Sequence, residues 1–193
     1  MIKSFTGPMF CDKSAYLIEI YKRIWNKSIV AAFKPKVNTR DGNAIKSRKY
    51  PNFEIPSLYV DTVEDIQKIV LENGYKTVLI DEAEFLTGDA SVLVDMSVML
   101  GVDFYIAGLN MTSEQVPFGL MPAILSVSDE ITIIRGFCED CNKPSVYSYS
   151  LNTEKKDEIL VGDNYISLCH ECLKKRVLEK KQKTLGRIKW FIY

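Results

Sequence analysis

The residues nearest the start of the chain that could do chemistry form the run Gly7-Pro8-Met9-Phe10-Cys11-Asp12-Lys13-Ser14. Its spacing follows the phosphate-binding loop G-x-x-x-x-G-K-[ST]. In that loop backbone N–H groups surround phosphates, the lysine reaches the terminal phosphate oxygens and the hydroxyl ligates Mg²⁺. Gly7, Lys13 and Ser14 stand where the pattern needs them, whereas Asp12 replaces its second glycine. If the loop binds ATP, it predicts a phosphotransferase. If Asp12 disables it, the chain keeps a fold without the chemistry.

Asp12 has a conformational and an electrostatic consequence. The glycine that it replaces usually adopts a positive φ, which aspartate tolerates better than most other residues. The charge matters more, because a carboxylate ~5 Å from a phosphate at an effective dielectric of ~20 costs roughly 3 kcal/mol. That energy corresponds to about two orders of magnitude in affinity, which Lys13 or Mg²⁺ offsets in part. We therefore expect Asp12 to weaken ATP binding without abolishing it.

A second acidic pair, Asp81-Glu82, follows the apolar run 77–80, which has the character of a short buried strand. In phosphate-loop folds an acid at the end of a neighbouring strand holds Mg²⁺, directly or through water. A carboxylate beside it can accept the proton of an attacking hydroxyl. The alternative is a solvated turn at a strand end. The phosphate-loop pattern upstream favours the catalytic interpretation.

Four cysteines form two C-x-x-C pairs, Cys138/Cys141 and Cys169/Cys172, with 27 residues between the pairs. Four thiolates at such spacing are typical of tetrahedral Zn²⁺ in a closed, structural site. The alternative, four unrelated buried cysteines, does not explain two intact pairs. His170 lies between two expected ligands and is read as a bystander. Because four cysteines leave no open coordination position, the metal should stabilise a loop and take no part in catalysis.

Hydrophobic periodicity predicts alternating strands and helices, and therefore an α/β fold with a mainly parallel sheet covered on both faces. Between 36 and 57 turn-forming residues predict a long loop. A helix capped by Asp61 should end at Asn73-Gly74. We expect strands at 2–6, 28–33, 77–80, 102–109 and 130–136, and further helices at 14–25, 90–100 and within 117–127.

The chain divides into three predicted parts. Residues 1–137 should form an α/β domain of the phosphate-loop NTPase (RecA-like) type. Residues 138–175 should form a small zinc-binding domain, and residues 176–193 a charged tail with an aromatic end.

Composition narrows the function classes. The 193 residues are 47% apolar and 26% charged, with a formal net charge of zero. A neutral chain has no global field that would recruit nucleic acid or an anionic membrane. The apolar runs are far shorter than a membrane span, and the first residues lead directly into the phosphate loop, which argues against a cleaved signal peptide. Paired C-x-x-C motifs then indicate metal binding in a reducing cytoplasm.

Several motifs in order make the chain resemble the type II thymidine kinases, P-loop deoxynucleoside kinases with a zinc-anchored lasso loop, to about residue 173. The matching stretches are Gly-Pro-Met-Phe-x-x-Lys-Ser at 7–14, Lys34-Pro35 with Arg40, Ser47-Arg48, Ile80-Asp81-Glu82-x-x-Phe85, Leu109 through Pro117-Phe118-Gly119, and the four cysteines with Gly162 and Tyr165.

The resemblance implies transfer of a phosphoryl group from Mg·ATP to the 5′-hydroxyl of thymidine or a related pyrimidine deoxynucleoside. It implies that Lys13, Ser14 and the rest of the loop bind ATP phosphates and Mg²⁺ together with Arg40 and Asp81, and that Glu82 is the general base. It also implies an apolar nucleoside pocket, completed by the zinc-anchored lasso. The residues implied for that pocket are Met9, Phe85, Leu109, Phe118, Gly162 and Tyr165. Such kinases are commonly cytosolic homotetramers that serve thymidine salvage.

The chain also departs from this family pattern at positions expected to face ligands. Asp12 replaces a glycine, Asn38 an aspartate, and Ser113 an aromatic residue that normally packs on the nucleoside. These changes support an alternative, a catalytically impaired pseudokinase that binds a nucleotide or a protein. A third hypothesis, a zinc-ribbon protein that binds nucleic acid, is disfavoured by the zero net charge. Retention of Lys13 and Glu82 favours the kinase.

Overall fold

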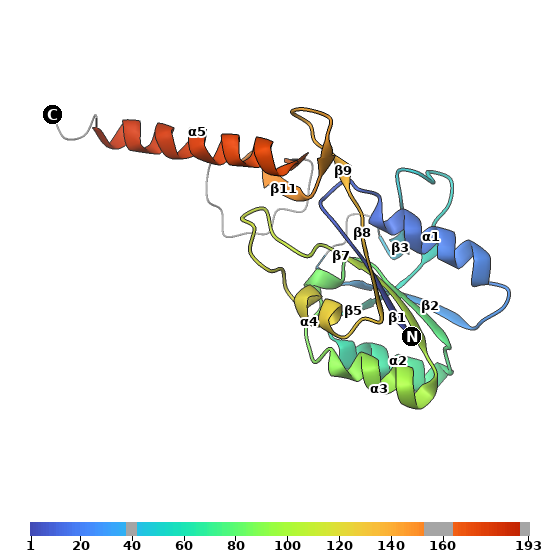
Figure 1. The fold of residues 1–193 in the computed structure, drawn as a ribbon. Coiled ribbons are helices and arrows are strands. Elements are labelled where there is room, and N and C mark those ends of the chain that lie inside the picture. The colour runs from blue at the N-terminus through green and yellow to red at the C-terminus, as the bar shows by residue number, and fades with distance from the viewer. Residues whose placement is uncertain (38–41, 153–163, 190–193) are drawn as a thin grey trace.

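Six parallel strands form the centre of the molecule, as a computed structural model describes it for residues 1–37, 42–152 and 164–189 (Figure 1). The spatial order is β5-β2-β6-β7-β1-β8, and every neighbouring pair is parallel. The predicted α/β fold with a mainly parallel sheet is thereby confirmed. The strands are β1 Ile2–Thr6, β2 Val30–Pro35, β5 Leu58–Val60, β6 Thr77–Ile80, β7 Asp103–Gly108 and β8 Glu130–Ile133.

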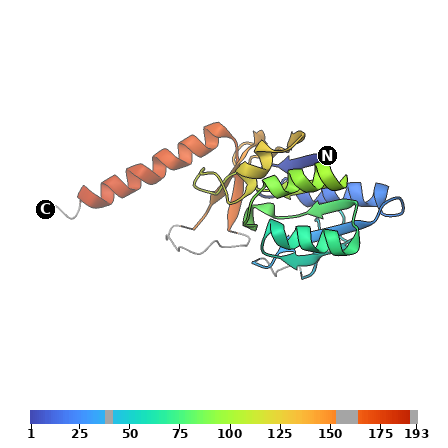
Figure 2. The same cartoon turned by 90° about the horizontal axis from the view of Figure 1, so that it is seen from below.

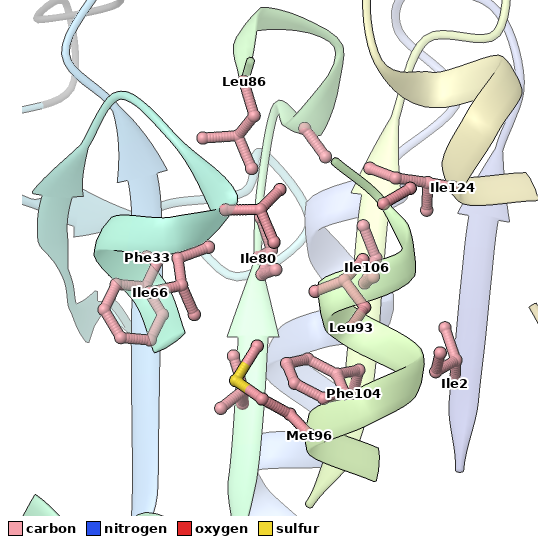
Figure 3. Close-up of a cluster of buried hydrophobic side chains, with 14 of the residues drawn as sticks. Ile2, Phe33, Ile66, Ile80, Leu86, Leu93, Met96, Phe104, Ile106 and Ile124 are labelled. Carbon is pink, nitrogen blue, oxygen red and sulfur yellow. The ribbon is translucent and has the colours of Figure 1, made fainter. Parts of the chain in front are cut away.

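Helices cover both faces of this sheet (Figures 1 and 2). Helices α2 (Val63–Asn73), α3 (Ser91–Leu100) and α4 (Met121–Ser126) pack on one face, and α1 (Lys13–Ile24) packs on the other. Alternate strand residues supply the two cores, because successive side chains of a strand point to opposite faces. On β7, Phe104 and Ile106 join the α2/α3 core that Figure 3 shows, whereas Ala107 joins the α1 core.

The cap of α2 corrects one expectation. Thr62, and not Asp61, is the N-cap residue: its side chain accepts the Asp65 N–H at 3.0 Å, and Asp65 accepts the Thr62 N–H at 3.1 Å. Glu64 stands three residues after Asp61, but its carboxylate accepts the Asp89 N–H at 3.0 Å. The reciprocal capping box therefore forms between Thr62 and Asp65. The predicted end is confirmed, because Gly74 adopts the left-handed conformation after Asn73.

The region 36–57 is more regular than predicted. It contains a two-residue antiparallel pair, β3 (Ala44–Ile45) and β4 (Ile55–Pro56), whose isoleucines are buried in the α1 core. Two-residue strands leave no alternating pattern for a sequence to reveal. The edge strand β5, with three residues, is also too short for its alternation to be recognised in the sequence.

The last strand of the sheet is shorter than the expected 130–136, because β8 ends at Ile133 and Gly136 already pairs within a small unit that has its own core. Strand β9 (Gly136–Phe137) pairs with β10 (Pro144–Ser145), and β11 (Tyr147–Ser150) pairs with β12 (Tyr165–Leu168). Helix α5 (His170–Lys189) then projects away from the body (Figures 1 and 2). Within the described ranges no helix combines the length and apolarity that a membrane crossing requires.

Candidate active site

The strand order explains how distant segments reach one cleft. Strand β7 lies between β1 and β6, and parallel strands place their carboxyl ends at the same edge of the sheet. The loop after β1, the Asp81-Glu82 pair after β6 and Leu109 after β7 therefore meet there. Within the described residues the cleft is lined by Met9, Phe10, Asp12, Lys13, Ser14, Lys46, Ser47, Arg48, Asp81, Glu82, Glu84, Gly108 and Leu109.

In the loop 7–14 the side chain of Lys13 folds back and contacts the backbone at the start of the loop. The ammonium of Lys13 donates to the carbonyl oxygens of Gly7 at 3.2 Å and Pro8 at 2.7 Å. The guanidinium of Arg48 lies over the Phe10 ring, with the guanidinium carbon 4.8 Å from the ring centroid. Cys11 is buried behind the loop, where burial raises the pKa of its thiol. To contact a phosphate in the cleft, Lys13 would have to leave these two carbonyls.

Asp12 adopts the conformation that the missing glycine predicts. Its φ of 60° and ψ of 34° are left-handed, and it precedes the first residue of α1. Its side chain forms no capping hydrogen bond and is exposed. The carboxylate therefore lines the cleft at the helix N-terminus, where phosphates are favoured by the helix dipole.

Ser14 and Asp81 are brought together across the cleft. The Ser14 hydroxyl donates to Asp81 Oδ2 at 2.8 Å, and the Glu82 N–H donates to Asp81 Oδ1 at 3.1 Å. Burial raises the pKa of Asp81, against the Ser14 hydrogen bond and the positive charges of Lys34 and Lys13. A hydroxyl and a carboxylate oxygen in contact form a donor set of the kind that Mg²⁺ takes, so these two residues fit the ion expected with ATP.

Glu82 lies at the end of β6 in a left-handed conformation, with φ 56° and ψ 39°. Its carboxylate is 3.9 Å from the ammonium of Lys34, a side chain that is only 1% exposed. Lys34 reaches this point because β2 and β6 pair with Phe33 opposite Ile80. Sequence motifs included Lys34 but gave it no role. Its position at the end of β2 could have indicated a role at the site, but only with the knowledge that β2 and β6 are neighbouring strands.

Glu84 is a cleft residue that the sequence analysis missed. It belongs to the short 3₁₀ helix η1 (Ala83–Phe85), and its Oε2 accepts the Leu109 N–H at 3.0 Å. The only sequence signal was a third acid two positions after Glu82.

The residues expected to surround a nucleoside fall into two groups. Met9 and Leu109 line the cleft, whereas Phe85, Phe118 and Tyr165 are outside the lining found among the described residues. Phe85 and Phe118 contact each other edge to face, with ring centroids 5.3 Å apart. Tyr165 lies on β12, paired with Ser150 of β11.

The contact between the two phenylalanines depends on a glycine beside one of them. A Cβ on Gly119, which has φ 49°, would lie 1.7 Å from the Glu84 carbonyl oxygen, so only glycine allows this approach. The segment after Glu82 and the segment 117–119 are packed together for this reason. Ser113 lies in the loop that precedes that segment, where the Gln115 side chain donates to its carbonyl oxygen. Arg40, Asn38 and Gly162 lie outside the described residues.

The four cysteines converge as the spacing predicted. The Sγ atoms of Cys138, Cys141, Cys169 and Cys172 all lie within 4.8 Å of one another, and Cys141 and Cys169 approach to 3.6 Å. Tetrahedral Zn²⁺ with sulfur ligands at ~2.3 Å separates its sulfurs by roughly 3.8 Å. The cluster therefore fits a metal such as zinc.

The small unit that contains the four cysteines also contacts the phosphate loop. Ser148 and Ser167, which are cross-strand partners on β11 and β12, are both buried. The Met9 N–H donates to Ser148 Oγ at 2.9 Å, and Ser167 Oγ donates to the Met9 carbonyl at 2.6 Å. We call these two residues the serine clamp. The serine clamp joins both backbone polar groups of Met9, a cleft residue, to the strand pair β11/β12.

Comparison with known proteins gives the same assignment along most of the chain. The family model described as Thymidine kinase matches residues 1–173. The chain is similar to the thymidine kinase of Bacteroides fragilis, with 32% identity over 192 residues, which cover 95% of this chain and 92% of the relative. It is similar to that of Mycoplasma mobile, with 31% identity over 176 residues, 89% of this chain and 86% of the relative. The thymidine kinase of Pseudothermotoga lettingae is 29% identical over 175 residues, 88% of this chain and 92% of the relative.

The family match spans the phosphate loop, the acidic pair and the four cysteines together. The structure places the first two in one cleft and gathers the cysteines in one cluster that is joined to that cleft. The chain belongs to the thymidine kinase family, a family of phosphate-transferring enzymes.

Proposed function

We propose that this protein transfers the γ-phosphoryl group of ATP to the 5′-hydroxyl of thymidine. The observation that carries the proposal is the meeting of Lys13, Ser14, Asp81 and Glu82 in one cleft, with Ser14 and Asp81 in hydrogen-bond contact at 2.8 Å. Phosphoryl transfer requires positioning and charge stabilisation more than covalent chemistry, and this set supplies both.

Each residue has a defined part in the proposed reaction. Lys13 turns from the Gly7 and Pro8 carbonyls to the phosphate oxygens and neutralises charge that develops on the transferred group. Ser14 and Asp81 would hold Mg²⁺, which supplies Lewis-acid stabilisation of that charge. Glu82 accepts the proton of the nucleoside hydroxyl as the new P–O bond forms and the bond to ADP breaks, while Lys34 orients its carboxylate. Met9 and Leu109 provide the near wall of the nucleoside pocket.

The finer features of the family assignment are part of the same proposal. We propose Zn²⁺ as the metal of the four cysteines, a phosphate-loop domain over 1–137, a metal-binding domain over 138–175, and a tail over 176–193. We further propose that Phe85, Phe118, Gly162 and Tyr165 complete the nucleoside pocket, that Arg40 contributes to phosphate binding, and that the enzyme is a cytoplasmic homotetramer active in nucleotide salvage. The alternative of a pseudokinase has no support in the comparisons, since the relatives named above are thymidine kinases.

The proposal is tested by incubating the purified protein with Mg·ATP and thymidine and measuring thymidine monophosphate. We expect steady product formation, and Lys13→Met should lower kcat by about two to three orders of magnitude because one phosphate-facing cation is lost. Wild-type protein that binds Mg·ATP but forms no thymidine monophosphate would contradict the proposal. Deoxycytidine and deoxyuridine in place of thymidine measure which pyrimidine is preferred.

Asp12→Gly is expected to improve ATP binding. Glycine adopts the left-handed conformation of position 12 at no steric cost, and the substitution removes an exposed carboxylate from the phosphate site. Solvent and salt screen an exposed charge, so we expect the KM for ATP to fall by about tenfold and not by the hundredfold of an unscreened pair. The KM for thymidine is the internal control and should stay within about twofold. An unchanged KM for ATP would show that the Asp12 charge has no cost here.

A further inference from the structure

Glu84 is a buried carboxyl group in the cleft that the proposed reaction does not use. Its residue is only 4% exposed, yet the side chain reaches the carboxyl end of the central strand β7. Its Oε2 accepts the Leu109 N–H at 3.0 Å. Gly108 makes this approach possible, because a Cβ there would lie 2.8 Å from the same oxygen. Glu84 thus links the segment that bears Glu82 to a wall of the proposed nucleoside pocket.

The charged groups around Glu84 are few. Lys13 faces it from the phosphate loop, Asp81 faces it from the end of β6, and Glu82 of its own segment lines the same cleft. Among the described residues its other close neighbours have no ionisable side chain. They are Gly108 at the end of β7, Leu109 after it, Gly119 before α4 and Met121 at the start of α4. Burial raises the pKa of Glu84 to about 7, against the Lys13 charge and the backbone N–H groups of Glu84 and Leu109.

We propose that Glu84 is a positioning residue that acts in its protonated form: it holds Leu109 beside the catalytic segment, and its ionisation weakens triphosphate binding in the cleft. The inference rests on the proposed function, because it takes the phosphates of ATP to lie over the loop 7–14. The complex of Mg²⁺ with the triphosphate has a net negative charge, so its binding adds negative charge to the cleft even with the metal included, and its phosphates draw the Lys13 charge toward themselves. Both effects favour the protonated carboxyl, so a protein that has lost this proton must take it back from solvent before ATP binds well.

The first experiment follows thermal unfolding without ligand for wild type and Glu84→Gln between pH 4.5 and 8.5. The folded protein holds the Glu84 proton up to about pH 7, whereas the unfolded chain releases it near 4.5. Between these values the folded state binds more protons, so wild type loses stability as pH rises, and glutamine, which cannot ionise, does not. We expect the Tm of the variant relative to wild type to rise by roughly 5–10 °C across this window and then to level off.

The second experiment measures binding of Mg²⁺ with the β,γ-imido analogue of ATP by calorimetry at pH 6, 7 and 8.5. We expect the ratio of the wild-type Kd to the Glu84→Gln Kd to be close to one at pH 6 and to rise to as much as about thirtyfold at pH 8.5. Because both proteins share Glu82 and the titration of the nucleotide, those effects cancel in the ratio. The Kd ratio therefore changes above pH 7, whereas the Tm difference changes below pH 7.

Glu64→Gln is the matched control. Glu64 is an exposed glutamate outside the cleft that accepts a backbone N–H in the same way, from Asp89 at 3.0 Å. Its Tm difference and its Kd ratio should not change with pH.

Glu84→Ala, which removes the acceptor for the Leu109 N–H, should raise the KM for thymidine by about tenfold, whereas Glu84→Gln retains an acceptor oxygen and should not.

The outcomes separate this inference from the proposed function. A Tm difference or a Kd ratio for Glu84→Gln that is constant with pH overturns the role of the proton. Equal thymidine KM values for Glu84→Ala and Glu84→Gln overturn the positioning role. If neither wild type nor Glu84→Gln binds the analogue at any pH, the proposed function fails and the effect on triphosphate binding fails with it. Tight binding with identical pH dependence leaves the function intact and refutes the role of Glu84.

Discussion

Replacing Glu82 with glutamine is expected to lower kcat by about two to four orders of magnitude, with both KM values within about threefold of wild type. Glutamine has nearly the same shape and keeps an acceptor oxygen toward Lys34, but it cannot take the proton of the nucleoside hydroxyl. The backbone should keep its left-handed φ of 56°, because glutamine and glutamate have the same Cβ and Cγ, and Gln115 in this chain already adopts a φ of 61°. Steady-state kinetics with Mg·ATP and thymidine give the measurement.

Glu64→Gln serves again as the control, because it makes the same chemical change outside the cleft and should leave kcat unchanged. Calorimetric binding of thymidine to Glu82→Gln shows whether the pocket survives the substitution. A kcat within tenfold of wild type would remove Glu82 from the role of base. A large loss of thymidine binding would instead make it a binding residue.

Lys34 gives this prediction its structural basis. A lysine that is 1% exposed is rare unless its charge is compensated, and here the Glu82 and Asp81 carboxylates supply the compensation. The ammonium in turn opposes the rise that burial causes in the pKa of Asp81. The two carboxylates and the buried lysine therefore form one electrostatic unit at the ends of β2 and β6.

Sequence reasoning located the parts of this site whose signal is local. The phosphate loop and the cysteine pairs are defined by spacing along the chain, and Asp81-Glu82 is marked by the apolar strand that it follows. The parallel sheet followed from alternation of strands and helices. These features need no knowledge of which strands are neighbours.

The features that sequence reasoning missed depend on strand order or on very short elements. Glu84 and Leu109 meet because β7 separates β1 from β6, and nothing in the sequence gives that order. Lys34 meets Glu82 for the same reason, through β2 and β6. The short pair β3 and β4 carries too few residues for periodicity. The error at the start of α2 differs in kind. The sequence has two overlapping pairs at capping-box spacing, Asp61 with Glu64 and Thr62 with Asp65, and only the second pair forms the box.

The link between the metal cluster and the cleft leads to the second large effect that we expect. Cys138→Ser should abolish zinc binding, lower Tm by roughly 10 °C and raise the KM for ATP by at least about tenfold. Cys138 and Cys169 belong to a small core that includes Leu168 and Leu173, and β11 and β12 pack on that core. When the metal is lost, the hairpin that carries the serine clamp loses its anchor, and Met9 loses both backbone partners. Zinc content, thermal unfolding and ATP kinetics measure the three effects.

Ser167→Ala separates the clamp from the metal. This variant keeps all four cysteines and should bind one zinc per chain, but it leaves the half-buried Met9 carbonyl without the hydroxyl that donates to it at 2.6 Å. An unsatisfied buried acceptor costs about 1–3 kcal/mol, so the KM for ATP should rise by about tenfold while zinc content stays at the wild-type value. Cys11→Ser is the control for zinc content, since Cys11 lies outside the cluster and should leave the metal bound. Wild-type protein without zinc would contradict the metal assignment. A Ser167→Ala enzyme with an unchanged KM for ATP would mean that the metal acts on stability alone. A raised KM with full zinc content would show that the metal-binding unit positions the phosphate loop through the Ser167 hydroxyl, and that the cysteine cluster contributes to the ATP site.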